Sequence, residues 1–158
     1  MLFTGIDLIE VPRLQRAVER WGRRFLCRVF TSGELADCGC STMPLPEHIV
    51  PPPPNYTSLA ARWAAKEAAA KALGVGLRGL AGQRNAAYAD APRIAWTDIE
   101  VTRGALGQPL LRLHGTAARV AAAYGVRELA VSLAHTQAYA VAHVIGLGDA
   151  GTGEINIE

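Results

Sequence analysis

The sequence predicts an α+β fold, in which a mostly antiparallel sheet is covered by helices on one face. The first observation is an apolar strand pattern at residues 2–10, followed at once by an amphipathic helix. The second is a pair of Ala-rich helical segments at residues 56–73 and 116–124. The third is a set of short strand patterns separated by turn residues, which form two predicted hairpins at 97–114 and 129–145.

Size and composition indicate one folded domain. The 158 residues suffice for one core but not for two domains of ordinary size, and half of them are hydrophobic. We assign the domain to residues 1–147 and expect the tail, 148–158, to be frayed. The net charge of +2 and the lack of nucleic-acid motifs argue against a nucleic-acid partner.

The sequence also predicts a soluble, cytoplasmic protein. It shows no signal peptide and no apolar run of the roughly 20 residues that a membrane span needs. The three cysteines, Cys27, Cys38 and Cys40, lack the spacing of a zinc site and cannot all pair within the chain. They are predicted to be reduced thiols without a functional role.

The first strand leads into a basic helix. Pro12 is placed to open this helix, which is predicted from Arg13 to about Phe25 with a weak point at Gly22. Its apolar side chains share one arc: Leu14, Ala17, Val18, Trp21 and Phe25. An adjacent arc about 100° wide holds Arg13, Arg16, Arg20, Arg23 and Arg24. This face is either simply solvated or docks an acidic partner that relieves the repulsion between the arginines.

The remaining elements follow from capping and turn signals. Thr31 and Glu34 have the spacing of a capping box, which predicts a short second helix. Residues 38–56, with four consecutive prolines, indicate a Pro-rich surface insertion. The later predictions are a helix from Tyr56 to Leu73 capped by Gly74, a loop at 75–95, strands at 97–102 and 109–114 joined by a turn at 104–108, a helix at 116–124 closed by Gly125, and strands at 129–134 and 138–145 joined at 135–137.

Two carboxylates are candidate metal ligands. Asp7 lies inside an apolar strand, where a carboxylate is costly unless it is paired or metal-bound. It could instead cap the next helix or pair with Arg13. Glu67 is surrounded by Ala on a helix expected to pack closely on the sheet, although it also has the i,i+4 spacing of a surface ion pair with Lys71. Two hard oxygen ligands beside cations would hold Mg²⁺ against a phosphate ester, which suggests phosphoryl-type transfer.

His135 and Thr136 are candidate phosphate donors. They follow a predicted strand, although a single histidine in a turn is more often simply exposed. A different magnesium-dependent phosphotransferase acting on a nucleotide would normally carry a Gly-rich phosphate loop with Lys-Ser/Thr, and this sequence has none.

Four short motifs are spread along the chain. In order they are Gly5, Asp7 and Arg13; Phe30, Thr31 and Glu34; Lys66, Glu67, Ala68, Lys71, Ala72 and Gly74; and Ser132, His135, Thr136, Tyr139 and Ala140. Each is weak alone, but in this order they resemble the holo-acyl-carrier-protein synthase type of the 4′-phosphopantetheinyl transferase superfamily. The resemblance covers about residues 2–37 and 57–146.

The resemblance implies that the phosphopantetheine arm of coenzyme A is transferred to a serine of an acyl carrier protein, releasing adenosine 3′,5′-bisphosphate. Asp7 and Glu67 would bind Mg²⁺, Lys71 would complete the catalytic set, and Glu67 acting through a water is the candidate base. The implied coenzyme A contacts are Arg62, Lys71, Gly74, Pro109, His135 and Thr136. The implied contacts to the acidic carrier protein are Arg13, Arg23, Arg24 and Phe25.

The resemblance also implies a homotrimer, in which each site takes Asp7 and Glu67 from one subunit and His135 from the next. Two segments, 38–56 and 79–96, are longer than the family's usual connectors and adjoin regions that contact coenzyme A. The main alternative is a non-catalytic module that docks an acidic carrier-like protein through its arginine-rich helix. The sequence leaves open which carrier is served, and whether the pathway is fatty acid biosynthesis or secondary metabolism.

Overall fold

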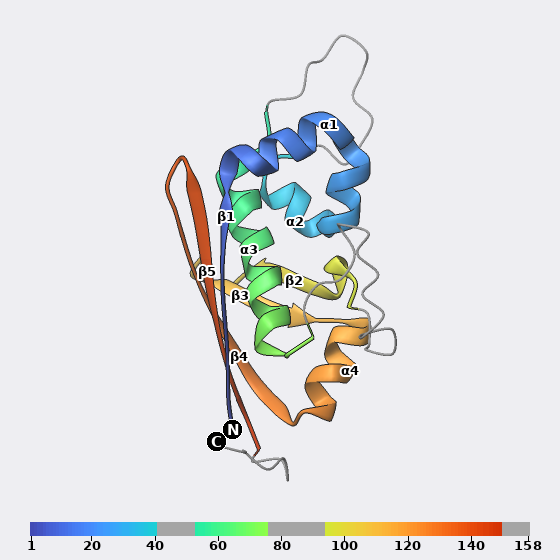
Figure 1. The fold of residues 1–158 in the computed structure, drawn as a ribbon, viewed down its shortest axis with the longest axis vertical. Helices are drawn as coiled ribbons and strands as arrows, with labels where there is room; N and C mark the ends of the chain where they lie inside the picture. Colours follow the sequence, from blue (N-terminus) through green and yellow to red (C-terminus); the bar gives the residue numbers. More distant parts are fainter. Residues whose placement is uncertain (41–52, 76–93, 150–158) are drawn as a thin grey trace, which may run out of the picture.

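A three-stranded antiparallel sheet is the base of the fold (Figure 1). The computed structural model describes residues 1–40, 53–75 and 94–149. The sheet has the order β1-β5-β4, from β1 (Leu2–Glu10), β4 (Val126–His135) and β5 (Tyr139–Gly148). A second, two-stranded sheet pairs β2 (Ile99–Arg103) with β3 (Pro109–Leu113). The predicted α+β class and antiparallel pairing are confirmed.

The helices lie on one side of the three-stranded sheet. They are α1 (Val11–Val29), α2 (Ser32–Asp37), α3 (Tyr56–Ala72) and α4 (Gly115–Ala123), with a 3₁₀ turn η2 (Trp96–Asp98). Helix α3 packs directly on β1 and β5. In Figure 1, α1 and α2 lie on the side of α3 away from the sheet, and the β2–β3 hairpin crosses behind α3 toward β4, which β3 contacts. None of the helices in the described part of the chain is both long enough and apolar enough to cross a membrane.

Local signals explain where α2 and α3 begin and end. Thr31 and Glu34 form the predicted capping box: the Thr31 N–H donates to Glu34 at 2.8 Å, and the Glu34 N–H donates to the Thr31 hydroxyl at 3.2 Å. Asn55 caps α3 by accepting the Ser58 N–H at 3.0 Å. Gly74 follows the helix with φ 68°, the left-handed conformation that favours glycine.

Helix α1 is longer and more bent than predicted. It continues to Val29, and Gly22 within it adopts φ 54° and ψ −140°, which kinks the helix at the predicted weak point. Trp21, which the sequence places on the apolar arc, has a side chain that is 57% exposed. The kink at the next residue breaks the helical period, and the Trp21 ring lies against Arg20 at 4.8 Å instead of in the core.

Several boundaries differ from those predicted. Thr97 and Asp98 belong to η2 and not to a strand; the Asp98 carboxylate accepts the Thr116 N–H at 3.0 Å at the start of α4. Strands β4 and β5 are longer than predicted and are joined at 136–138, because β5 pairs along its whole length with neighbours on both sides. Most of the Pro-rich insertion (41–52), the loop at 76–93 and the tail at 150–158 lie outside the described residues.

The outer face of the three-stranded sheet is apolar and exposed. While α3 covers the inner face, large hydrophobic side chains point outward from the two neighbouring strands β1 and β5. They are Leu2, Ile6, Leu8, Ile145 and Leu147, each at least 41% exposed. A patch of this kind on a soluble domain is typical of an association surface.

Candidate active site

Asp7 faces inward because of the alternation of β1. Leu2, Ile6 and Leu8 point outward, so Gly5 and Asp7 point toward α3. A Cβ on Gly5 would lie 2.0 Å from the Ala68 carbonyl oxygen and 2.7 Å from the Ala72 nitrogen. Glycine therefore allows α3 to approach β1 closely, and this approach brings the polar side of α3 next to Asp7.

Lys71, in the last turn of α3, is the ion-pair partner of Asp7. Its Nζ lies 2.6 Å from Asp7 Oδ1 and 3.2 Å from the Ile6 carbonyl oxygen. Asp7 is thus placed in neither of its alternative roles, since it does not pair with Arg13 and α1 has no side-chain cap among the described residues. The Asp7 side chain is only 10% exposed, and its Oδ2 is buried without a hydrogen-bond partner in the described part of the chain.

Glu67 lies close enough to Asp7 for the two charges to interact. Burial raises the pKa of Glu67, and the Asp7 carboxylate raises it further, while Lys71 and Arg13 oppose the shift. Burial and the neighbouring Asp7 disfavour the charge of Glu67, and Asp7 has a buried, unpartnered oxygen. A hard divalent cation would stabilise such a site. Among the described residues, no three or more His, Cys, Asp or Glu side chains are grouped so that they could hold a metal ion, so Asp7 and Glu67 would be the only side-chain ligands of these types at the proposed site.

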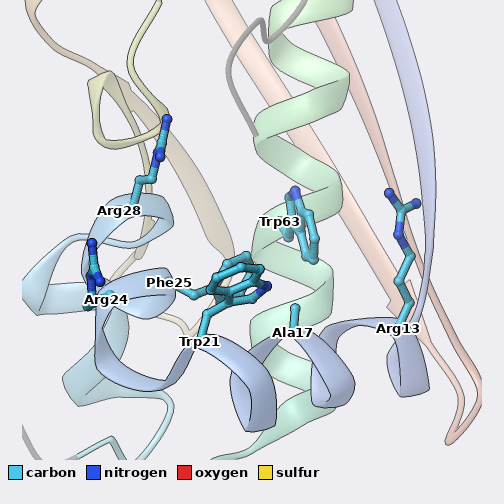
Figure 2. Close-up of a pocket in the computed structure, with 7 residues that line it drawn as sticks. All are labelled: Arg13, Ala17, Trp21, Arg24, Phe25, Arg28 and Trp63. Atoms are coloured by element: carbon cyan, nitrogen blue, oxygen red, sulfur yellow. The ribbon is translucent and has the colours of Figure 1, made fainter. Parts of the chain in front are cut away.

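A basic groove of about 570 Å³ runs along α1 (Figure 2). It is lined by Arg13, Ala17, Trp21, Arg24, Phe25, Arg28 and Trp63. Of the predicted carrier-binding residues, the structure brings Arg13, Arg24 and Phe25 into this groove, whereas Arg23 is not among its lining residues. Arg28 was missed, although it follows Arg24 at the i,i+4 spacing that places side chains on one face of a helix.

Trp63 connects the groove with the carboxylates. It lies one turn before Glu67 on α3, and its ring packs edge-on against the rings of Phe25 and Trp96. The distances between the ring centres are 5.4 Å to Phe25 and 5.9 Å to Trp96. The Arg13 guanidinium lies 5.8 Å from the Trp63 ring centre and also lowers the pKa of Glu67. Arg13 therefore links the groove, which it lines, to Glu67, with which it interacts electrostatically.

A second pocket, of about 420 Å³, lies between the first half of α3, the β2–β3 hairpin and β4. It gathers three of the predicted coenzyme A contacts, Arg62, Pro109 and His135, together with Arg103, which the sequence did not single out. Thr136 lies next to it in the β4–β5 turn, where its hydroxyl accepts the backbone N–H of Tyr139 at 3.1 Å. The other two predicted contacts, Lys71 and Gly74, are not in this pocket: Lys71 is paired with Asp7, and Gly74 ends α3.

The carboxylate site at Asp7 and the second pocket lie at different edges of the three-stranded sheet. Asp7 is on β1 and the second pocket borders β4, which are the two outer strands in the order β1-β5-β4. Because α3 covers the face between them, a ligand bound in the second pocket is separated from Asp7 of the same chain by this helix.

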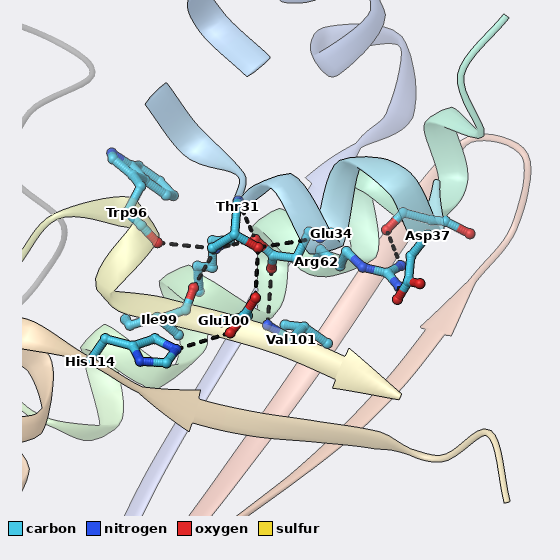
Figure 3. A network of polar contacts seen from close by, with 11 residues as sticks. Thr31, Glu34, Asp37, Arg62, Trp96, Ile99, Glu100, Val101 and His114 are labelled. Atoms are coloured by element: carbon cyan, nitrogen blue, oxygen red, sulfur yellow. Dashed lines mark hydrogen bonds and ion pairs between the residues drawn. The ribbon is translucent and has the colours of Figure 1, made fainter. Parts of the chain in front are cut away.

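A buried polar network joins α2, α3 and β2 (Figure 3). Glu34 and Lys66 form an ion pair at 2.8 Å with both side chains fully buried. Glu34 also accepts the Val101 N–H at 3.0 Å, and Lys66 donates to the carbonyl oxygens of Trp96 and Ile99. The network fixes β2, which forms a wall of the second pocket, to the helix that carries Glu67. The capping-box spacing identified Glu34, but no sequence signal indicated that Lys66 is buried.

The cysteines have no part in the site. All three are free thiols, as predicted. Burial raises the pKa of Cys38 to about 11 and also raises that of Cys40, so both stay protonated at neutral pH.

Comparison with known proteins points to one family. The model of the 4′-phosphopantetheinyl transferase superfamily matches residues 4–143. A Chloroflexus aggregans protein named holo-[acyl-carrier-protein] synthase is 51% identical over 149 residues, which cover 94% of this chain and 97% of that protein. A Herpetosiphon aurantiacus protein of the same name is 47% identical over 148 residues, covering 94% of this chain and all of that protein.

Solved structures have the same fold. The complex of ACPS with CoA from Chronobacterium ammoniagenes aligns with a TM-score of 0.68 and 26% identity, covering 94% of this chain and 98% of that one. The acyl carrier protein synthase of Mycobacterium tuberculosis aligns with a TM-score of 0.61 and 31% identity, covering 93% and 97%. Both alignments span nearly the full length of each chain, so the similarity concerns the whole domain and not a single shared motif.

Proposed function

The chain belongs to the 4′-phosphopantetheinyl transferase superfamily, and we propose that it transfers the 4′-phosphopantetheine arm of coenzyme A to a serine of an apo acyl carrier protein. This is the activity for which its relatives at about half identity are named. The products are the holo carrier protein and adenosine 3′,5′-bisphosphate. The observation that supports the proposal in this chain is the interaction of Asp7, Glu67 and Lys71 with one another, together with Arg13, which lines the groove and acts on Glu67.

Asp7 and Glu67 would hold a Mg²⁺ ion. The buried, unpartnered Oδ2 of Asp7 and the raised pKa of Glu67 both fit a cation-binding role, because a cation would compensate two close carboxylates. When bound, Mg²⁺ supplies charge stabilisation to the diphosphate of coenzyme A.

The chain's own residues account for the remaining chemistry. The serine oxygen of the carrier forms a bond to the phosphorus that bears pantetheine, and the bridging P–O bond breaks, so adenosine 3′,5′-bisphosphate leaves with the electron pair. Lys71, whose side chain is 53% exposed beside Asp7, places an ammonium against the charge of the leaving group. Glu67 accepts the serine proton through a water molecule.

The second pocket would receive the nucleotide end of coenzyme A. Arg62 and His135 supply donors for phosphate, and Pro109 supplies an apolar surface for the adenine. Thr136, in the turn next to His135, and Gly74, after α3, are retained as proposed contacts from the family resemblance.

A homotrimer would complete the site. Within one chain, α3 separates the second pocket from Asp7, so a coenzyme A molecule that reaches both would use the pocket of one subunit and the carboxylates of the next. The exposed apolar face formed by β1 and β5 supports this association. Analytical ultracentrifugation should give three times the mass of one chain.

We also place the protein in the cytoplasm. Its three cysteines are free in the structure, which suits a reducing compartment.

The test is to incubate the protein with an apo acyl carrier protein, coenzyme A and Mg²⁺ and to record the mass of the carrier. We expect the carrier to gain the mass of one phosphopantetheine group. The alternative, a non-catalytic module that docks the carrier through α1, predicts carrier binding in a pull-down without any gain in mass.

Charge reversal in the groove should weaken carrier binding selectively. Arg24→Glu is expected to raise KM for the carrier about tenfold or more, because it replaces an attractive with a repulsive charge at the proposed contact. KM for coenzyme A should stay unchanged, and the effect should shrink as salt is added. Arg119→Glu, on the exposed face of α4, makes the same change in net charge away from the groove and serves as the control. A parallel rise of both KM values for Arg24→Glu would contradict the docking role.

A further inference from the structure

Two arginines in the second pocket share one carboxylate. Figure 3 shows this carboxylate, Asp37, beside Arg62. Asp37, the last residue of α2, has its Oδ2 3.1 Å from Arg62 Nη2 and 3.7 Å from Arg103 Nε. Arg62 comes from α3 and Arg103 from the end of β2, so the carboxylate joins two elements that line the pocket.

Arg62 is more buried than Arg103, so it depends more on Asp37 to balance its charge. The Arg62 side chain is 7% exposed, its Nη1 donates to the Ser58 carbonyl oxygen at 3.4 Å, and its Nε is buried without a partner among the described residues. A buried guanidinium needs a counter-charge, and Asp37 is the carboxylate that contacts it. Although the Asp37 side chain is itself 38% exposed, its substitution would leave the buried Arg62 guanidinium without this counter-charge.

The cluster keeps a positive charge after pairing. One carboxylate neutralises one of two guanidinium groups, and the remaining N–H donors line the pocket with His135. Planar guanidinium groups bind phosphate with two parallel hydrogen bonds, which makes an aligned pair of arginines suited to a phosphate monoester.

Coenzyme A carries phosphate in two places, the diphosphate and the ribose 3′-phosphate. The proposed function assigns the diphosphate to Asp7, Glu67 and Lys71, so the cluster at the other edge of the sheet is left for the 3′-phosphate. We propose that Asp37 is a positioning residue that aligns Arg62 and Arg103 for this 3′-phosphate, and that Arg103 is a further binding residue. This role rests on the proposed function. It makes the cluster of Asp37, Arg62 and Arg103 the reason why the protein prefers coenzyme A to dephospho-coenzyme A.

The experiment compares two substrates that differ only in the 3′-phosphate. Asp37→Asn is expected to lower the ratio of kcat/KM for coenzyme A to kcat/KM for dephospho-coenzyme A about tenfold. The loss should lie in KM for coenzyme A, with kcat and all constants for dephospho-coenzyme A nearly unchanged. Arg103→Gln should have the same selective effect, and Asp37→Glu should restore part of the preference.

The control is Asp149→Asn, which removes an exposed aspartate paired with Arg127 at 2.7 Å, away from the pocket. It should leave the ratio unchanged. An equal loss for both substrates in Asp37→Asn, or no loss at all, overturns the proposal. If Asp37→Asn lowers the melting temperature, the result for Arg103→Gln is used to test the proposal instead. The Arg103 side chain is 57% exposed and is not needed for the core.

Binding measurements separate this inference from the proposed function. Calorimetry compares adenosine 3′,5′-bisphosphate with adenosine 5′-monophosphate on the wild type and on Arg103→Gln, without any carrier protein. A preference for the bisphosphate that disappears in the variant supports the phosphate cluster even if no transfer to the carrier is detected. Transfer without such a preference keeps the proposed function and overturns the inference.

Discussion

Glu67→Gln is expected to reduce phosphopantetheine transfer on the order of 10³-fold, because it removes one of two proposed metal-binding carboxylates and the proposed base. Transfer is measured from the mass of the carrier over time, with Asp7→Asn as a second variant that should lose activity to a similar extent. Asp149→Asn is the matched control and should retain wild-type turnover, since its carboxylate contacts only exposed groups. Wild-type turnover in Glu67→Gln would show that this carboxylate does not hold the metal.

The free energy of unfolding of Glu67→Gln provides a second test that does not depend on activity. Burial and the nearby Asp7 charge raise the pKa of Glu67, so between its ordinary pKa and the raised value the folded protein binds more protons than the unfolded chain. The free energy of unfolding of the wild type therefore falls as pH increases through this window. Glutamine does not ionise, so the free energy of unfolding of Glu67→Gln lacks this pH-dependent loss. Glu67→Gln should match the wild type below the ordinary pKa and be more stable at neutral pH.

Urea unfolding across a pH series, without added metal, measures this difference. A variant that is less stable than the wild type at neutral pH would mean that the Glu67 carboxylate is stabilised by its surroundings and not held near another negative charge.

Lys66→Met is expected to destabilise the fold by about 3–5 kcal/mol. The substitution leaves the Glu34 carboxylate fully buried without its cation, and it removes the donors that satisfy the carbonyl oxygens of Trp96 and Ile99. Urea unfolding gives the value, and Lys71→Met is the control, because its parent lysine is 53% exposed and its loss leaves less buried charge.

A double-mutant cycle with Glu34→Gln tests the pairing itself. Removing both charges should cost less than the sum of the two single substitutions, because neither variant side chain then leaves a buried, unpaired charge. Simple additivity would show that Glu34 and Lys66 contribute to stability independently of each other.

Elements with strong local signals were predicted well. The strand at 2–10, the capping box at Thr31 and Glu34, and the helix ended by Gly74 are set by alternation, caps and glycine conformation, which act over a few residues. Elements without such signals were placed less accurately. The lengths of β4 and β5 depend on pairing partners, and the exposure of Trp21 depends on the kink at Gly22.

The sequence alone determined the family motifs and the class of the fold, and it indicated the acidic and basic residues that are proposed to carry the chemistry. Only the tertiary structure decided which of these residues meet. Lys71 pairs with Asp7 across 64 residues of chain, Lys66 is buried against Glu34, and Asp37 joins Arg62 to Arg103. Contacts between distant segments arise when whole elements pack, and the close approach of α3 to β1 at Gly5 shows how one backbone position controls them. Local patterns do not encode the direction from which a partner element arrives, so these pairings could not be derived from spacing along the chain.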